Sequence, residues 1–251
     1  MPTRTGRGTS NITGRLVLAA GLALALAACG ERKAERVDPA AYDAFFLWAG
    51  VPAPDYLREA QLAYLLAGEI RAGDPPRYVR LRAVPQGAPA EIWLTVRAER
   101  IDWDDAAYEA VLGDLERWQA AGNRLGGLQV DFDARTRGLG NYARFLADLR
   151  ERLPRRYGLS ITGLMDWSAG GDPGPLARLA GTVDEIVVQT YQGRETIPGY
   201  EAWLASLERL GMPYRIAIVE GGEWRAPAGL EKDPHFRGYV VFLLPPRRRA
   251  P

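Results

Sequence analysis

The sequence predicts an α/β protein, an irregular (β/α)8 barrel of the TIM type with one or two helices missing. Short apolar runs recur along the chain, and amphipathic helical patterns lie between several of them. Strands that alternate with helices in one domain favour a parallel sheet, and eight strands suit a closed barrel. The eight runs are residues 44–48, 78–83, 91–96, 128–132, 160–164, 185–189, 215–219 and 239–243.

The connections between these runs are of two kinds. Helical spacing of apolar residues predicts helices over 104–122, 139–154 and 199–211, and an earlier helix over 55–70. The segment 84–90 is too short for a crossover helix, and 221–238 has no clear helical pattern. An open doubly wound sheet is the alternative, but no Gly-x-Gly-x-x-Gly motif or P-loop follows a strand.

The N-terminal segment has the pattern of an export signal. A basic start precedes thirteen apolar residues, too few to span a bilayer. The run ends in Leu-Ala-Ala-Cys-Gly, which resembles a bacterial lipoprotein signal. The resemblance implies cleavage before Cys29, acyl chains such as palmitate at the new N-terminus, and attachment to the cell envelope, at the outer membrane facing the periplasm. A secreted protein with a free Cys29 is the alternative.

We therefore expect a signal peptide over 1–28, a tether over 29–38, a barrel domain over 39–246 and a basic tail over 247–251. The formal charge of +1 gives no overall field that would recruit nucleic acid. A single histidine and a single cysteine argue against a zinc site or a Ser-His-acid triad, and no cofactor is expected. A hard-cation site at Asp131, Asp133 and Asp166 stays open.

The segment Gly126–Arg135, "GGLQVDFDAR", separates an apolar face from a polar face. Side chains alternate along a strand, so Leu128 and Val130 point one way. Gln129, Asp131 and Asp133 point the other way, toward the interior and the C-terminal mouth of a barrel, where barrel enzymes place their chemistry. The two carboxylates lie roughly 6.6 Å apart along the strand, close enough to perturb each other's ionisation. This favours general acid catalysis.

On these residues the chain resembles family 18 glycoside hydrolases, whose fourth strand reads Asp-Gly-x-Asp-x-Asp-x-Glu. Gly127 and Asp131 match, while Gln129 and Asp133 stand where the family has Asp and the catalytic Glu. Gln189-Thr190-Tyr191-Gln192 is similar to the family's Met-x-Tyr-Asp, with Tyr191 matching. Residues 42–244 also resemble a family of bacterial exported proteins of unassigned function. Both resemblances imply a glycosidase-like barrel, and the resemblance to family 18 also implies that the barrel handles a carbohydrate.

Two further strand ends carry polar and aromatic residues. Asp166 and Trp167 follow the fifth strand, and Glu220, Glu223 and Trp224 follow the seventh. The leading hypothesis takes Asp133 as the proton donor, Asp131 as its electrostatic neighbour and Glu220 as the nucleophile or base. The expected substrate-binding residues are Tyr191, Gln189, Gln129, Asp166, Trp167, Glu223 and Trp224, the tryptophans by stacking on a sugar. A non-catalytic glycan-binding lipoprotein and an envelope scaffold are the rival readings.

Overall fold

The computed structural model describes residues 34–134, 138–167 and 173–245, all within the compact unit that starts at Ala34. The expected signal peptide, Cys29 and the basic tail lie outside the described residues, so the lipid anchor, the membrane attachment and the envelope location stay predictions. Among the helices of the described segments, none has the length and the hydropathy that crossing a membrane requires.

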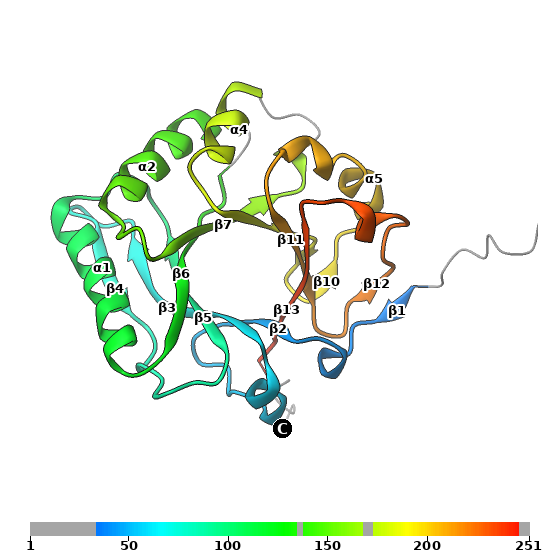
Figure 1. The fold of residues 1–251 in the computed structure, drawn as a ribbon, viewed down its shortest axis with the longest axis horizontal. Coiled ribbons are helices and arrows are strands. Elements are labelled where there is room, and N and C mark those ends of the chain that lie inside the picture. Colours follow the sequence, from blue (N-terminus) through cyan, green and yellow to red (C-terminus); the bar gives the residue numbers. More distant parts are fainter. Residues whose placement is uncertain (1–33, 135–137, 168–172, 246–251) are drawn as a thin grey trace, which may run out of the picture. The chain divides into compact units, whose positions relative to one another are not determined.

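Eight parallel strands of the described chain form a closed barrel, which confirms the predicted fold class (Figure 1). Each strand pairs with its neighbour in the ring, and the pairing of the first strand with the second closes it. The barrel strands are β2 (Ala44–Leu47), β3 (Leu62–Arg71), β5 (Glu91–Ala98), β6 (Arg124–Asp131), β7 (Gly158–Leu164), β8 (Glu185–Gln189), β11 (Tyr214–Val219) and β13 (Phe236–Phe242).

The second barrel strand is not the one predicted. The predicted helix over 55–70 is instead a short 3-10 helix, η2 (Asp55–Glu59), followed by β3. The predicted strand over 78–83 is β4 (Arg77–Arg80), which pairs antiparallel with the C-terminal part of β3 and is not one of the eight barrel strands. The run that became β3 is buried on both faces, so it lacks the alternation that separates a strand from a helix.

Helices cover only part of the ring. The first two predicted helices are confirmed as α1 and α2, while the third is shortened to α5 and a 3-10 turn, η4 (Leu207–Leu210). Three connections within the described residues, β2 to β3, β3 to β5 and β11 to β13, have no α-helix, the last only a 3-10 turn, η5 (Leu230–Lys232). The helices are α1 (Asp105–Ala120), α2 (Leu139–Arg152), α4 (Pro173–Ala180) and α5 (Tyr200–Leu204) (Figure 1).

Two small antiparallel sheets extend the barrel beyond its ring. The strand β1 (Glu35–Arg36) pairs with β12 (Glu223–Trp224), and β9 (Tyr191–Gln192) pairs with β10 (Glu195–Thr196). A 3-10 turn, η1 (Pro39–Ala41), follows β1 and is capped by Asp38. The folded part therefore reaches back to β1, within the segment expected to be a tether.

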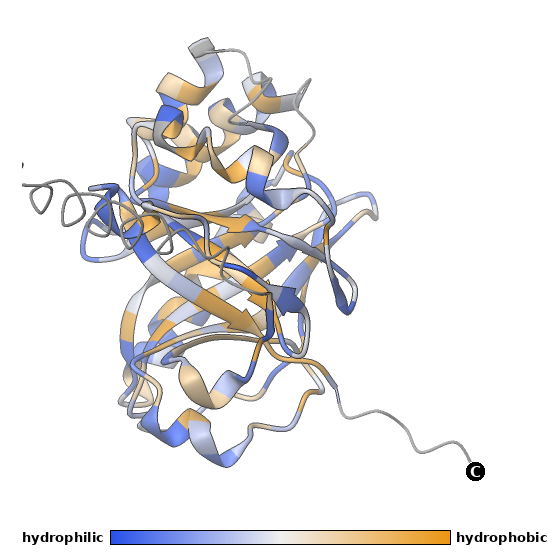
Figure 2. Ribbon diagram, turned by 90° about the vertical axis from the view of Figure 1, so that its right-hand side faces the viewer, coloured by the Kyte–Doolittle hydropathy of each residue, from blue (hydrophilic) through white to orange (hydrophobic). Residues whose placement is uncertain are grey.

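Apolar side chains fill both the interior of the barrel and the space between strands and helices, and Figure 2 shows the hydrophobic colouring along the strands. Leu128 and Val130 are fully buried in the outer cluster, as the alternation of "GGLQVDFDAR" predicts. Phe46, Tyr64 and Trp93 belong to the inner cluster. The polar residues of β6 consequently face the interior.

Close contact between β6 and β7 requires glycine at position 127. A Cβ on Gly127 would lie 2.1 Å from the carbonyl oxygen of Gly158, a backbone atom that cannot move aside. Gly127→Ala should therefore lower the free energy of unfolding by about 1–3 kcal/mol, measured by urea denaturation. Gly113→Ala is the matched control, because that glycine lies within α1 with open space around it and alanine favours a helix. Equal stability of the Gly127 variant and wild type would contradict the prediction.

Candidate functional site

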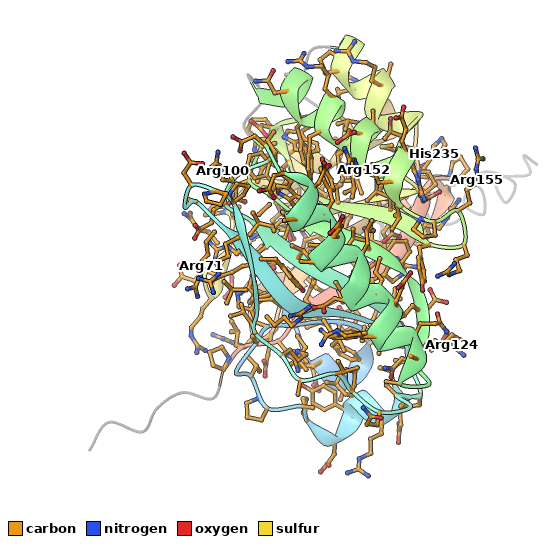
Figure 3. All side chains as sticks on the ribbon, turned by 90° about the vertical axis from the view of Figure 1, so that its left-hand side faces the viewer. Arg71, Arg100, Arg124, Arg152, Arg155 and His235 are labelled. Atoms are coloured by element: carbon orange, nitrogen blue, oxygen red, sulfur yellow. The ribbon has the colours of Figure 1, made fainter. Side chains whose placement is uncertain are left out.

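A pocket of about 220 Å³ opens at the carboxyl end of the barrel strands, and we call it the mouth pocket. It brings together Asp131, Asp133, Gln189 and Tyr191, four of the residues that the sequence predicted for one site. The carboxyl end and the amino end of the barrel are opposite faces: Figure 3 shows Arg71 and Arg100 on one side and Arg124 on the other. The full lining is Phe46, Trp48, Arg97, Asp131, Asp133, Thr162, Val187, Gln189, Tyr191, Gly193, Ala217 and Phe242.

Asp131, the last residue of β6, has the most perturbed carboxyl group of the pocket. Burial, and to a smaller extent the charge of Asp133, raise the pKa of Asp131 from 3.8 to about 6. The hydroxyl of Thr162, which donates to Oδ1 of Asp131 at 2.8 Å, and the guanidinium of Arg97 act in the opposite direction. Asp131 therefore carries a proton in part of the molecules near neutral pH, while Asp133 lies exposed at the rim.

Tyr191 and Gln189 form a second wall of the pocket, on β9 and β8. Gln189 Nε2 donates to the carbonyl oxygen of Tyr191 at 3.2 Å, and the Tyr191 ring stacks on Phe242 with centroids 5.0 Å apart. Burial first, and then the charges of Asp131 and Asp133, raise the pKa of Tyr191 above its usual range. The phenol consequently stays protonated and can donate a hydrogen bond to a ligand.

The remaining wall is aromatic and was missed by the sequence analysis. Trp48 meets Phe242 edge to face at 5.4 Å, and Phe46 lies beside them in the lining. Arg97 and Thr162 were missed as well. All five lie in barrel strands or next to their ends, so an inventory of inward positions on every strand could have found them.

Gln129 lies in the barrel interior, outside the mouth-pocket lining, and both ends of its amide are occupied. It is fully buried, accepts from Thr95 Oγ1 at 3.2 Å and donates from Nε2 to Ser160 Oγ at 3.1 Å. Ser160 in turn donates to Glu185. The structure therefore does not place Gln129 with the other predicted substrate-binding residues, because its hydrogen bonds hold the interior of the barrel together.

That interior contains a connected set of polar side chains, which we call the buried polar network. Glu185 is its centre: Oε1 accepts from Ser160 Oγ at 3.0 Å and from the Tyr64 hydroxyl, and Oε2 accepts from Arg215 Nε at 3.2 Å. The members are Tyr64, Thr95, Gln129, Ser160, Glu185 and Arg215.

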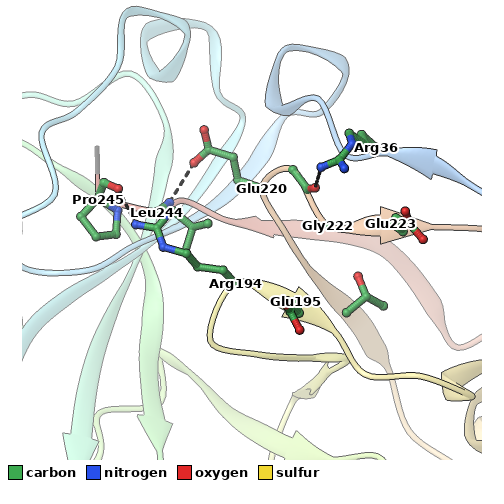
Figure 4. Close-up of a pocket in the computed structure, with 10 residues that line it drawn as sticks. Arg36, Arg194, Glu195, Glu220, Gly222, Glu223, Leu244 and Pro245 are labelled. Carbon is green, nitrogen blue, oxygen red and sulfur yellow. Dashed lines mark hydrogen bonds between the residues drawn. The ribbon is translucent and has the colours of Figure 1, made fainter. Parts of the chain in front are cut away.

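Glu220 and Glu223 do not line the mouth pocket. They line a second cavity of about 720 Å³, which we call the outer cavity. Oε2 of Glu220 accepts from the backbone N–H of Leu244 at 2.8 Å (Figure 4). The structure does not bring Glu220 into one pocket with Asp133, because Glu220 follows β11 and lines the outer cavity.

The two tryptophans expected to stack on a sugar are packing residues. Trp167 is 1% exposed and its Nε1 donates to the carbonyl oxygen of Ala134 at 2.9 Å. Trp224 is 7% exposed and stacks on Tyr200 at 4.5 Å. Asp166, beside Trp167, is partly buried and lines neither cavity. In the segments that the structure describes, no cluster of three or more His, Cys, Asp or Glu side chains is arranged for a metal ion.

The closed barrel with a pocket at the carboxyl end of its strands defines a (β/α)8 protein of the TIM type, and comparisons with known proteins agree with this fold. The chain belongs to the family described as a domain of unknown function (DUF3142), which matches residues 92–218. This match runs from β5 to β11 and includes both aspartates of the mouth pocket. No curated protein matches the chain.

Solved structures share the fold at low sequence identity. The xylanase and α-amylase inhibitor protein of Scadoxus multiflorus has a TM-score of 0.50 at 11% identity, covering 79% of this chain and 92% of that chain. A chitinase from Bacteroides thetaiotaomicron has a TM-score of 0.50 at 8% identity, covering 71% of this chain and 67% of that chain. The Bacillus cereus spore cortex-lytic enzyme SleL has a TM-score of 0.49 at 16% identity, covering 70% of this chain, which spans about half (49%) of that one.

Proposed function

We propose that this protein binds a glycan in the mouth pocket and cleaves a glycosidic bond there by general acid catalysis. One observation carries the proposal: Asp131, with its pKa raised to about 6, lies in a pocket with an aromatic wall at the carboxyl end of the barrel. A general acid works best when its pKa lies near the working pH, because it then holds a proton and still releases it.

In this proposal the two aspartates have different roles from those in the sequence hypothesis. Asp131 holds the proton, since it is the more buried of the two and lies beside the negative charge of Asp133. Asp133, exposed at the rim, supplies that charge and contacts solvent or ligand. The Tyr191 hydroxyl and the Gln189 amide are placed to orient the substrate.

Asp131 ends β6 and Asp133 follows it by two residues, and the described lining contains no carboxylate from an opposite strand. A pair of acids on opposite sides of the scissile bond is therefore not available in this pocket. The attacking group in the proposed reaction is water or a group of the substrate itself, as in substrate-assisted glycosidases. The aromatic wall of Trp48 and Phe242 suits the C–H face of a sugar ring.

The test uses chitin oligosaccharides, because one structural neighbour is a chitinase. Wild type should bind them and release shorter products, and the rate should fall as the pH rises through about 6, where Asp131 loses its proton. Asp131→Asn should slow hydrolysis by about a hundredfold without weakening binding. Asp55→Asn, a change on the exposed η2 turn, is the matched control. Absence of binding by wild type would refute the proposal.

A second candidate function is glycan binding without cleavage. It is favoured by the exposed position of Asp133 and by the absence of an opposing carboxylate in the described lining. The same titration separates the two functions: saturable binding with no product at any pH would establish the binding protein.

A further inference from the structure

The outer cavity begins where the mouth pocket ends. Gly193 lines the mouth pocket and Arg194 the outer cavity; Phe242 lines the first and Leu244 the second. The same holds after β11, where Ala217 lines the mouth pocket and Glu220 the outer cavity. Three separate segments thus contribute residues close in sequence to both cavities, which places the two cavities next to each other.

Charged side chains of both signs line the outer cavity (Figure 4). Arg36 Nη1 donates to the carbonyl oxygen of Gly221 at 3.2 Å, and Arg194 Nη2 donates to that of Pro245 at 2.9 Å. The cavity also presents the carboxylates of Glu195, Glu220 and Glu223. Across the described chain, no ion pair joins these arginines to these glutamates, which leaves guanidinium donors and carboxylate acceptors available to a ligand.

The charges of this lining nearly cancel, since three glutamates face two arginines. A neutral polyhydroxyl ligand satisfies both signs, because its oxygens accept from guanidinium groups and its hydroxyls donate to carboxylates.

The two cavities differ in volume. The mouth pocket, at about 220 Å³, is smaller than the roughly 300–1,000 Å³ of typical ligand pockets, whereas the outer cavity, at about 720 Å³, falls within that range. We infer that the outer cavity binds the continuation of a neutral oligosaccharide whose terminal sugar occupies the mouth pocket. This inference rests on the proposed function, and it makes Glu220 and Glu223 binding residues.

Calorimetric titration of the full chain carrying Asp131→Asn, which slows cleavage, tests the inference. The probes are N-acetylglucosamine and longer chitin oligosaccharides. The longer probes should bind about tenfold more tightly than the single sugar, because they add charge-assisted hydrogen bonds. Adding Glu223→Gln or Arg194→Gln to the Asp131→Asn chain should remove that gain and leave the affinity for the single sugar as it is in Asp131→Asn alone.

Arg124→Gln is the matched control, since this exposed arginine begins β6 at the amino end of the barrel (Figure 3). Glu223→Gln keeps the size of the side chain, so a lost affinity gain in this variant reports a lost contact with the ligand. In Arg194→Gln the same loss can also come from a disturbed loop around residue 194. The inference would be overturned if the longer probes still bound more tightly in both variants, or if they bound no more tightly than the single sugar at all. Binding of the single sugar would in either case still support the proposed function. Failure of every probe to bind would overturn both.

Discussion

Replacement of Glu185 by glutamine is expected to lower the free energy of unfolding by about 3–5 kcal/mol, the range for removing one partner of a buried ion pair. Glu185 is 7% exposed and accepts hydrogen bonds from Tyr64, Ser160 and Arg215. An amide in its place turns an NH2 group toward one of these donors and leaves the Arg215 charge without its partner. Urea denaturation at neutral pH measures the loss.

Controls separate the charge from the shape of the site. Asp55→Asn removes a carboxylate from an exposed pair with Arg58 and should leave stability close to wild type. The double change Glu185→Leu with Arg215→Leu should recover part of the loss, because it removes both charges together. A Glu185→Gln protein as stable as wild type would show that the buried polar network contributes nothing net.

Asp131→Asn is expected to stabilise the folded protein above pH 6 by up to about 3 kcal/mol, the equivalent of a pKa raised from 3.8 to about 6. Between these two values the folded state binds more protons than the unfolded state. Wild type therefore loses stability as the pH rises through this window, and the loss is complete above pH 6. Asparagine does not ionise and can still accept from Thr162, so the variant escapes the loss.

Unfolding by urea at a series of pH values measures this effect. The curves of wild type and Asp131→Asn should run together below pH 3.8 and separate up to about pH 6. Asp133→Asn removes the neighbouring charge, which contributes to the raised pKa of Asp131. In this variant the pH range over which stability is lost should therefore end at a lower pH. Parallel curves for wild type and Asp131→Asn would mean that the Asp131 carboxyl is not held in its protonated form.

The barrel could be predicted because seven of its eight strands are short apolar runs bounded by loops. The exception, β3, has inward and outward apolar residues in succession, and such a run has the same appearance in a strand and in a helix. The antiparallel β4 was then mistaken for the missing strand. Pairing direction depends on contacts between distant segments, which a single sequence does not display.

Within the site, alternation along β6 correctly placed Asp131 and Asp133 at one mouth, and Tyr191 joined them. The residues beyond the strand ends were harder to place, because loop direction is not periodic. Trp167 and Trp224 follow strands and precede glycine-rich or polar segments, yet both side chains are buried in the hydrophobic core. Trp48, at the end of the first strand, was available to the same reasoning and is the tryptophan that lines the pocket.

The buried polar network and the inner apolar cluster have one more consequence. Together they fill the barrel interior beneath the mouth pocket, so the pocket is closed at its inner end. A sugar that reaches Asp131 must leave by the opening through which it came. A long glycan can therefore present an end or a bend to the aspartates, but it cannot be threaded through the protein.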